Sequence, residues 1–121
     1  MIEPKTTDPF LGLVVVLIGP GTNSAAEDFV VPLHGAGRAT VVGQKSRGST
    51  GQPLPFSFLD GKITGRICIK RDTYPDGREF VGVGIIPDVE INPAPADIIA
   101  GRDVVLEKGM DILKSNINTK P

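Results

Sequence analysis

The sequence has almost no cysteine, histidine or tryptophan. Its 121 residues include one cysteine, Cys68, one histidine, His34, and no tryptophan. A single cysteine excludes a disulfide within the chain. One cysteine and one histidine cannot form a zinc site by themselves, so any metal centre would rest on carboxylates. The sequence therefore predicts neither a structural metal nor a bound cofactor.

An excess of charge of one sign and a long apolar run are also missing. There are 13 basic and 14 acidic residues, and the net charge of −1 argues against a protein that binds nucleic acid by electrostatic attraction. The apolar runs are far too short to span a bilayer, and no positively charged start precedes a signal-type segment. We expect no membrane span, and these features by themselves give no cellular location.

The length predicts one domain over residues 1–121. Pro4 and Pro9 keep residues 1–12 out of a helix, which predicts an extended lead-in. Residues 115–121 are predicted to form a frayed tail.

The chain is organised around one apolar run and the serine that follows it. Leu13–Ile18 has six apolar residues without a polar break, which is typical of a parallel strand covered on both faces. Glycines and a proline end this strand, and Ser24 then opens a helix that we expect to run to about Leu33. The residues expected on its buried face are Ala26, Phe29, Val30 and Leu33.

Ser24 has two interpretations. As a nucleophile, it would stand at the carboxyl edge of the sheet, where free N–H groups of the first helical turn can bind an oxyanion. As a cap, it would form a capping box with Glu27, and the spacing alone favours this interpretation because most helices are capped. His34 lies ten residues of helix away, about 15 Å, and is expected to be a surface histidine.

A glycine-rich loop follows the second predicted strand, Ala39–Val42, which completes a βαβ unit. Residues 43–51 nearly match a phosphate-binding loop. The lysine required after Gly48 is replaced by Ser49, and Pro53 stands where a helix should begin, which argues against nucleotide binding. We predict instead a substrate-lining loop made of Gly48, Ser49, Thr50, Gly51 and Gln52.

The second half of the sequence predicts a hairpin and a final helix. Phe56–Leu59 and Ile63–Lys70 should pair around Asp60-Gly61, with the second strand half exposed and Cys68 an ordinary strand residue. Asp103 should cap the last helix, with a buried stripe of Leu106, Met110 and Leu113. The fold class is α/β. A parallel strand needs neighbours on both sides, which predicts further strands from upstream or from another subunit, and an unpaired edge would favour a homo-oligomer.

Several motifs, in this order, resemble the C-terminal processing (tail-specific) serine peptidases. They are Val14–Gly19, Asn23–Phe29, Val41–Gly43, Gly48–Pro53, Tyr74–Gly77 and Gly82–Asp88, followed by the helix start at Asp103 and Leu106. The resemblance implies a ClpP/crotonase-like core with an added β-hairpin and a C-terminal helix. It implies a serine endopeptidase acting on polypeptides, with Ser24 as nucleophile and the backbone N–H of Ala25 in the oxyanion hole. Bacterial members of the family mostly work outside the cytoplasm, which implies the cell envelope or periplasm.

The chain departs from the family at the general base. Many members use a lysine at the position of Ser49, and Gln52 is only an approximate counterpart of their assisting glutamine. A branch that resembles the tricorn core protease takes a histidine from upstream of the nucleophile strand, where residues 1–12 have none. The chain is closer to this non-lysine branch, and Lys45 and Glu79 are the remaining candidates for the base and its acidic helper.

The resemblance therefore implies the C-terminal half of a catalytic domain, with little or no peptidase activity in the isolated chain. Two alternatives stay open. One is a non-catalytic fold fragment or interaction module, supported by the missing base. The other is a crotonase-type acyl-CoA enzyme, allowed by fold analogy alone.

Overall fold

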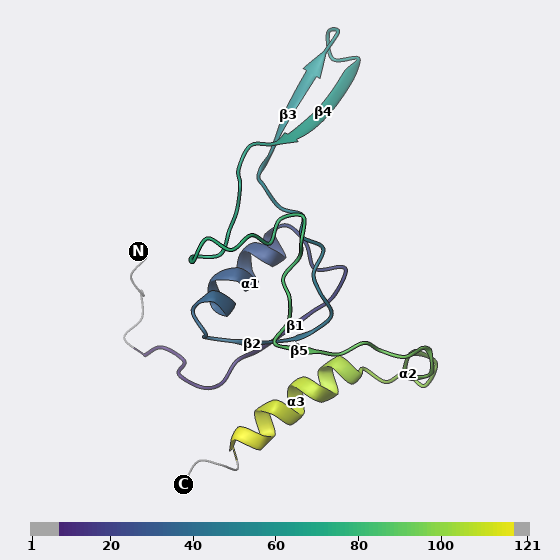
Figure 1. The fold of residues 1–121 in the computed structure, drawn as a ribbon. Coiled ribbons are helices and arrows are strands. Elements are labelled where there is room, and N and C mark those ends of the chain that lie inside the picture. The colour runs from purple at the N-terminus through teal and green to yellow at the C-terminus, as the bar shows by residue number, and fades with distance from the viewer. Residues whose placement is uncertain (1–7, 118–121) are drawn as a thin grey trace.

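The structure is a computed structural model that describes residues 8–117. It consists of a layered body and a two-stranded arm that projects from it (Figure 1). The elements in chain order are β1 (Val15–Ile18), α1 (Ala25–Gly35), β2 (Thr40–Gly43), β3 (Pro53–Phe58), β4 (Ile63–Cys68), β5 (Val89–Glu90), α2 (Pro95–Ile99) and α3 (Val104–Ile117).

The strands of the body form one parallel sheet in the order β1-β2-β5. Val16 of β1 lies opposite Val41 of β2, and β5 pairs along the other edge of β2. α1 connects β1 to β2, so the βαβ unit and the α/β fold class are confirmed. The predicted strands Leu13–Ile18 and Ala39–Val42 are both present, with slightly different ends.

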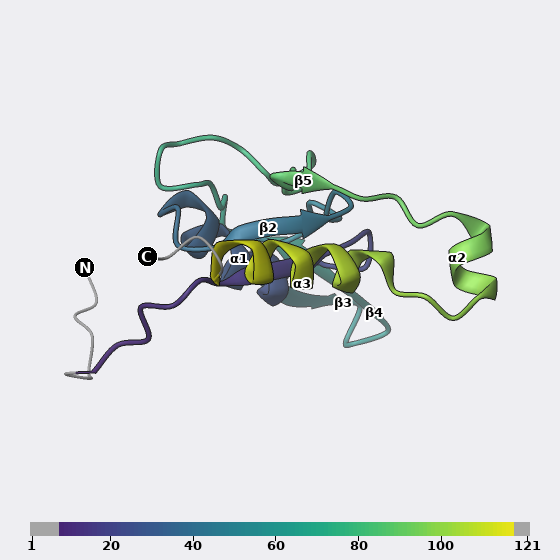
Figure 2. The ribbon, with the colours of Figure 1, turned by 90° about the horizontal axis from the view of Figure 1, so that it is seen from below.

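Side chains of β1 alternate between two helices. Ile18 packs in the core with Val30 and Val31 of α1. Leu17 points the other way, toward α3, where a Cβ added at Gly109 would lie 2.9 Å from the Leu17 Cδ2 atom. The sheet is therefore the middle of three layers, and Figure 2 shows α3 lying across it. Cover on both faces explains the unbroken apolar run.

α1 has about the predicted extent but buries a different face. The helix begins directly after Ser24, and its buried residues are Glu27, Val30 and Val31. Phe29 is 62% exposed and Ala26 is exposed too, so their predicted place on the buried face was wrong, whereas Val30 is buried as predicted. The cause is the carboxylate of Glu27, which turns toward the backbone of the loop after β2 and orients the helix.

α3 begins as predicted, because Asp103 Oδ1 accepts the N–H of Leu106 at 2.9 Å. The predicted buried stripe was wrong. Leu106 is 48% exposed and Met110 is 44% exposed, whereas Gly109 is buried. Without a side chain at Gly109 the helix approaches β1 closely, so this side of α3 faces the sheet.

The two ends of the described chain differ from each other. Residues 8–12 contain neither helix nor strand. Residues 115–117 belong to α3, so the predicted fraying does not start at Ser115. Residues 1–7 and 118–121, which complete the predicted lead-in and tail, lie outside the described residues.

β3 and β4 form the predicted antiparallel hairpin, with Phe56 opposite Gly65. Every residue of β3 is exposed, and so is every residue of β4 except Gly65, so the prediction of a half-exposed strand was wrong. The arm stands away from the body (Figure 1), and both of its faces meet solvent. Cys68 ends β4 as an exposed strand residue.

Two later segments depart from the sequence pattern. Residues 79–86 form no strand, apart from one isolated bridge between Glu79 and Thr73. α2 is not among the predicted elements. A proline suits the first turn of a helix. At the start of α2, Asp97 Oδ2 accepts the N–H of Ala94 at 3.0 Å, which stabilises that end of the helix.

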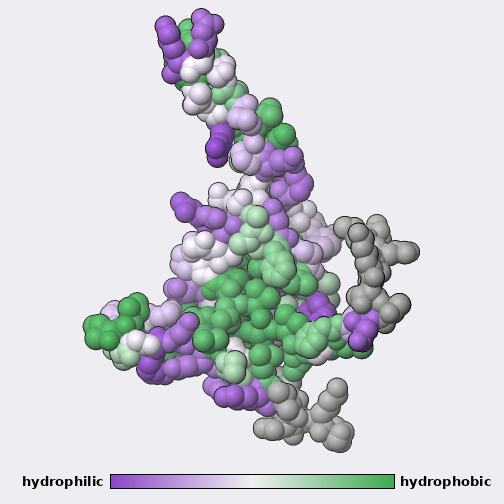
Figure 3. Space-filling view, turned by 180° about the vertical axis from the view of Figure 1, so that it is seen from behind, coloured by the Kyte–Doolittle hydropathy of each residue, from purple (hydrophilic) through white to green (hydrophobic). Residues whose placement is uncertain are grey.

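One face of the body is broadly apolar (Figure 3). The exposed large apolar side chains of the body include Leu13 and Leu17 near β1 and Phe29 on α1. Within residues 8–117, β1 has a partner strand along one edge alone. Surfaces of this kind are typical of contacts with further polypeptide.

Candidate active site

Ser24 lies at the sharp corner between β1 and α1. It is exposed, with a φ of +52° and a ψ of −127°, which residues other than glycine rarely adopt. Such conformations store about 1–3 kcal/mol of strain and cluster at functional sites. A strained serine on a strand-to-helix turn is also how α/β-hydrolases present their nucleophile. The backbone therefore favours a functional hydroxyl at Ser24.

The Ser24 hydroxyl does not cap α1. Ser24 and Glu27 are the residue pair of a capping box, but the Ser24 side chain makes no capping hydrogen bond. The reverse bond does form, from the Ser24 N–H to Glu27 Oε2 at 3.2 Å. Within residues 8–117 the N–H of Ala25 has no hydrogen-bond acceptor. The corner thus offers a free hydroxyl and a free N–H side by side.

Glu27 holds this corner in place. Its side chain is fully buried, with 0% exposure. The donors to its carboxylate are the hydroxyl of Ser46 at 2.5 Å and the N–H groups of Gly48 at 2.6 Å, Ser49 at 2.9 Å and Ser24 at 3.2 Å. A buried carboxylate is tolerated only with such partners. Three of these bonds fasten the first turn of α1 to the loop after β2, and the fourth holds the backbone of Ser24.

The predicted substrate-lining loop lies beside Ser24. The carbonyl oxygen of Ser49 accepts the N–H of Ser24 at 2.9 Å. The hydroxyl of Thr50 donates to Asp28, one helical turn beyond Ser24, at 3.1 Å. Gln52 leads out of the loop toward β3 with a φ of +48°. The first part of the loop therefore lines the corner, and the last part belongs to the base of the arm.

Two glycines give this loop its path. Gly48 has a φ of +72°, and a Cβ there would lie 2.5 Å from the backbone nitrogen of Gly84. Gly51 has a φ of +140°, and its carbonyl oxygen accepts the N–H groups of Ile69 and Lys70, each at 3.1 Å. A side chain at either position would strain the loop.

The two candidates for base and helper lie away from these contacts. Lys45 is exposed, and its Cγ would be 2.9 Å from a Cβ added at Gly84. Glu79 forms an ion pair with Arg71. Among the hydrogen bonds and ion pairs of residues 8–117, none joins Lys45 or Glu79 to Ser24. The contacts of the corner thus involve neither candidate.

His34 is not the surface residue that its position predicted. Its side chain is 15% exposed, and its Nδ1 lies 2.8 Å from the hydroxyl of Tyr74. Its Nε2 lies 3.1 Å from Oδ1 of Asp88, whose Oδ2 accepts the N–H of Val41 at 2.7 Å. The segment around Tyr74 folds back over the end of α1 and covers His34. This network fastens the end of α1 that is remote from Ser24.

Burial raises the pKa of Tyr74 above its ordinary value of 10.0. We expect the phenolate absorbance of the folded chain to appear at higher pH than in urea, where the pKa is ordinary. The neutral phenol is favoured in the fold, so its stabilisation is full below the unfolded pKa and is lost as pH rises through the folded pKa. Tyr74 is the one tyrosine and there is no tryptophan, so absorbance reports it alone. Coincident curves with and without urea would contradict the prediction.

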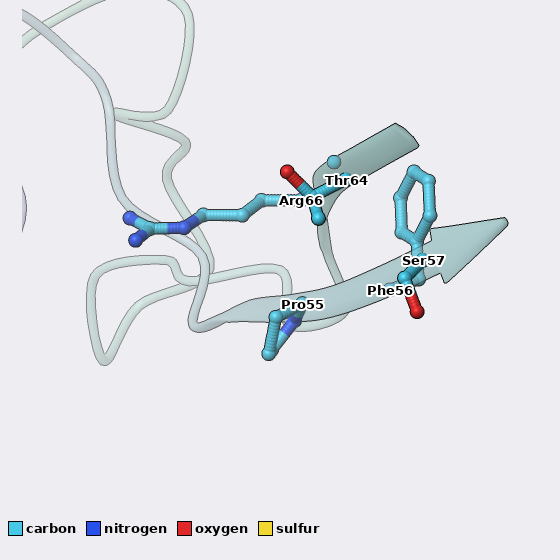
Figure 4. Close-up of a pocket in the computed structure, with 6 residues that line it drawn as sticks. Pro55, Phe56, Ser57, Thr64 and Arg66 are labelled. Atoms are coloured by element: carbon cyan, nitrogen blue, oxygen red, sulfur yellow. The ribbon is translucent and has the colours of Figure 1, made fainter. Parts of the chain in front are cut away.

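The cavities among residues 8–117 include two larger ones and a smaller one of about 280 Å³ whose lining includes Tyr74 and Glu79. One, of about 490 Å³, is on the arm, and Figure 4 shows its Phe56 and Arg66 side chains extending in different directions. Among its lining residues Arg66 alone is charged. The other, of about 510 Å³, runs along α1 and includes Asp28, one turn beyond Ser24. Of the two larger cavities, the second has a lining residue on α1 within one helical turn of Ser24.

Glu27 has a structural role that its position in the sequence did not reveal. Its spacing from Ser24 was visible, but that spacing is typical of an exposed cap. No sequence pattern indicated that Ser46 donates a hydrogen bond to Glu27, or that Asp28 accepts one from Thr50. In the part of the chain that the structure describes, no three His, Cys, Asp or Glu residues gather as a metal site, and no helix is long and apolar enough to cross a membrane.

Comparisons with known proteins point to one family. The sequence model of peptidase family S41 matches residues 3–91. A carboxyl-terminal-processing protease of Synechocystis sp. is 32% identical over 108 residues, which cover 86% of this chain and 25% of that protein. A crystal structure from Parabacteroides merdae, described as a peptidase, matches with a TM-score of 0.70 at 24% identity, covering 93% of this chain and 35% of the other.

The chain spans about a quarter of the length of the curated relative it matches. The structural match shows a shared fold. The family match includes Ser24, the glycine-rich loop and β5, and therefore most of the motifs that carried the resemblance. The chain belongs to peptidase family S41, and the predicted kinship with C-terminal processing peptidases is confirmed.

Proposed function

We propose that this chain carries the nucleophile of a serine endopeptidase of the C-terminal processing type, and that Ser24 is that nucleophile. The observation that carries the proposal is the strained backbone of Ser24, whose hydroxyl makes no capping bond and stands next to the free N–H of Ala25. Membership of a peptidase family supports a polypeptide as substrate.

The proposed reaction is acyl transfer. The Ser24 Oγ attacks the carbonyl carbon of a peptide bond while a base takes the hydroxyl proton. The N–H of Ala25 donates to the oxyanion of the tetrahedral intermediate. The amine leaves with a proton, and water then hydrolyses the acyl ester at Ser24. Glu27 keeps the attacking group in place by holding the backbone N–H of Ser24.

We propose that the isolated chain turns over peptides very slowly. A serine hydroxyl is a weak nucleophile without a base. Ser49, which has no basic group, lies beside Ser24, and Glu79 forms an ion pair with Arg71. A complete site would therefore take its base from another segment or subunit. The open edge and apolar face of β1 support a second copy of the chain as that partner, which light scattering would detect.

A fluorophosphonate probe tests Ser24 directly. We expect slow covalent labelling that peptide mass spectrometry locates at Ser24 and that Ser24→Ala abolishes. Ser57→Ala, which removes an exposed hydroxyl on the arm, is the matched control and should label like wild type. Labelling at another residue, or equal labelling of Ser24→Ala, would overturn the proposal. Rapid cleavage of an unstructured peptide by wild type would contradict the slow turnover.

A non-catalytic module is the competing interpretation, and stability separates the two. If Ser24 served as a cap, Ser24→Ala would cost about 1 kcal/mol of unfolding free energy. Because its side chain makes no capping bond, we expect a smaller change in urea denaturation. The parallel β1-α1-β2 unit with its nucleophile at the corner also supports the ClpP/crotonase-like core as our proposed fold.

A further inference from the structure

The cavity of about 510 Å³ along α1 includes Asp28, which is the lining residue of α1 nearest in sequence to Ser24. It is lined by Asp28, Val31 and Pro32 of the helix, and by Phe80 and parts of residues 70–75 on the other side. Asp28 follows Ser24 by one helical turn, about 6 Å along the axis. Ser24, Asp28 and Val31 have the spacing of one helix stripe. The lining of the cavity therefore starts about one helical turn from the residue that carries the hydroxyl.

The walls of this cavity combine an apolar base with charged groups. Val31 is 6% exposed, Phe80 1% and Tyr74 5%, so their side chains form a fixed apolar surface. The charged groups are the carboxylates of Asp28 and Asp72 and the ammonium of Lys70. This is the arrangement that suits a long side chain with an aliphatic stem and a polar end.

The charged side chains that line the cavity have a net negative charge, because there are two carboxylates and one ammonium. Lys70 pairs with Asp72, whose side chain is 13% exposed, and the hydrogen bond that Lys70 donates to Asp72 raises the pKa of Lys70 above its usual 10.5. Lys70 is therefore an ammonium at neutral pH, and it neutralises one carboxylate. The Asp28 carboxylate accepts the neutral hydroxyl of Thr50, at 3.1 and 3.2 Å to its two oxygens. One negative charge remains at the end of the cavity nearest Ser24.

We propose that this cavity is a subsite for an arginine or lysine side chain of a polypeptide substrate, with Asp28 binding its cationic end. The proposal rests on the proposed function of Ser24. A cationic side chain would meet two carboxylates and one ammonium, and its stem would lie on Val31 and Phe80. An anionic side chain would be repelled by the two carboxylates and attracted by the one ammonium. The Lys70 side chain is 58% exposed and can move aside for a substrate cation.

Binding of short capped peptides tests the subsite without catalysis. Three peptides that differ at one residue, arginine, citrulline or glutamate, are titrated by calorimetry into the 121-residue chain. Citrulline keeps the shape of arginine and lacks its charge. We expect arginine to bind about tenfold more tightly than citrulline, as for a charge-assisted hydrogen bond, and glutamate to bind least. Fluorescence of Tyr74, which lines the cavity, gives a second readout.

Variants connect this preference to the named residues. Asp28→Asn keeps an acceptor for Thr50 and should bring the arginine and citrulline affinities within about twofold of each other. Asp60→Asn, at an exposed turn of the arm, removes the same charge and should leave the tenfold ratio unchanged. Lys70→Gln removes a competing cation and should tighten arginine binding. Glutamate binding as tightly as arginine in wild type, or equal ratios in the two aspartate variants, would overturn the subsite.

The fluorophosphonate result separates this inference from the proposed function. If Ser24 is labelled and the arginine preference is missing, the subsite fails and the nucleophile stands. If the preference depends on Asp28 and Ser24 is never labelled, the cavity binds basic peptides and the peptidase role of Ser24 fails.

Discussion

Glu27→Ala should lower the unfolding free energy of the chain by about 3–5 kcal/mol, because it leaves several buried donors without an acceptor at about 1–3 kcal/mol each. Its carboxylate accepts the hydroxyl of Ser46 and three backbone N–H groups at 0% exposure. A domain of this size has a total unfolding free energy of about 5–15 kcal/mol, so this loss is a large share of its stability. Urea denaturation followed by circular dichroism measures it.

Two further variants make this prediction specific. Glu27→Gln keeps one carbonyl oxygen as acceptor but places an amide N–H₂ among donors, so we expect a smaller loss of about 2 kcal/mol. Glu107→Ala removes an exposed carboxylate that pairs with Arg102 on the surface, and should cost less than about 1 kcal/mol. Equal losses for Glu27→Ala and Glu107→Ala would show that Glu27 does not hold the corner.

The Glu27 variants should also affect Ser24, the proposed nucleophile. Glu27 accepts the N–H of Ser24 and the N–H of Ser49, whose carbonyl in turn accepts from Ser24. At a temperature where Glu27→Gln is still folded, we expect its labelling by the fluorophosphonate to be slower than that of wild type. Unchanged labelling in a measurably destabilised variant would limit Glu27 to a role in folding.

Ser49→Lys should accelerate fluorophosphonate labelling of Ser24 by about 100-fold, the lower range for a positioned general base. The backbone of residue 49 is hydrogen-bonded to Ser24 at 2.9 Å, and the residue is exposed, so a longer side chain has room there. The resemblance to the family implies that the lysine base of many members corresponds to this position. The rate should rise with pH, because only the neutral amine can take the serine proton.

Ser49→Met is the matched control, since methionine has a comparable stem and no amine. It should label at the wild-type rate, and Ser49→Lys combined with Ser24→Ala should not label at all. Equal rates for Ser49→Lys and Ser49→Met would show that position 49 cannot place a base on Ser24. A label on the new lysine itself, seen by mass spectrometry, would lead to the same conclusion.

The corner around Ser24 was predictable because local chemistry determines it. An apolar run ended by glycines predicts a buried strand, and a serine followed by alanines and Glu27 predicts a helix start. The same reasoning gave the cap of α3 at Asp103 and the hairpin turn at Asp60-Gly61. Each of these features depends on residues that are close in the sequence.

Long-range contacts were not predictable in this way. Glu27 is buried because Ser46, Gly48 and Ser49 lie across from it, and no local pattern indicates that these donors meet a carboxylate. Burial of His34 depends on the fold of a segment that starts 40 residues later, at Tyr74. The buried sides of α1 and α3 were likewise predicted incorrectly. The sheet and the loops that pack against a helix decide which of its apolar residues are buried.

The carbonyl of Gly51 accepts the N–H groups of Ile69 and Lys70 at the base of the projecting hairpin, and the carbonyl of Ser49 accepts the N–H of Ser24. Thr50 alone separates these two acceptors, and its own side chain is fastened to α1 through Asp28. A continuous set of hydrogen bonds therefore connects the hairpin to Ser24. If a polypeptide bound the hairpin and displaced it, we would expect the peptide group that accepts the N–H of the proposed nucleophile to shift as well.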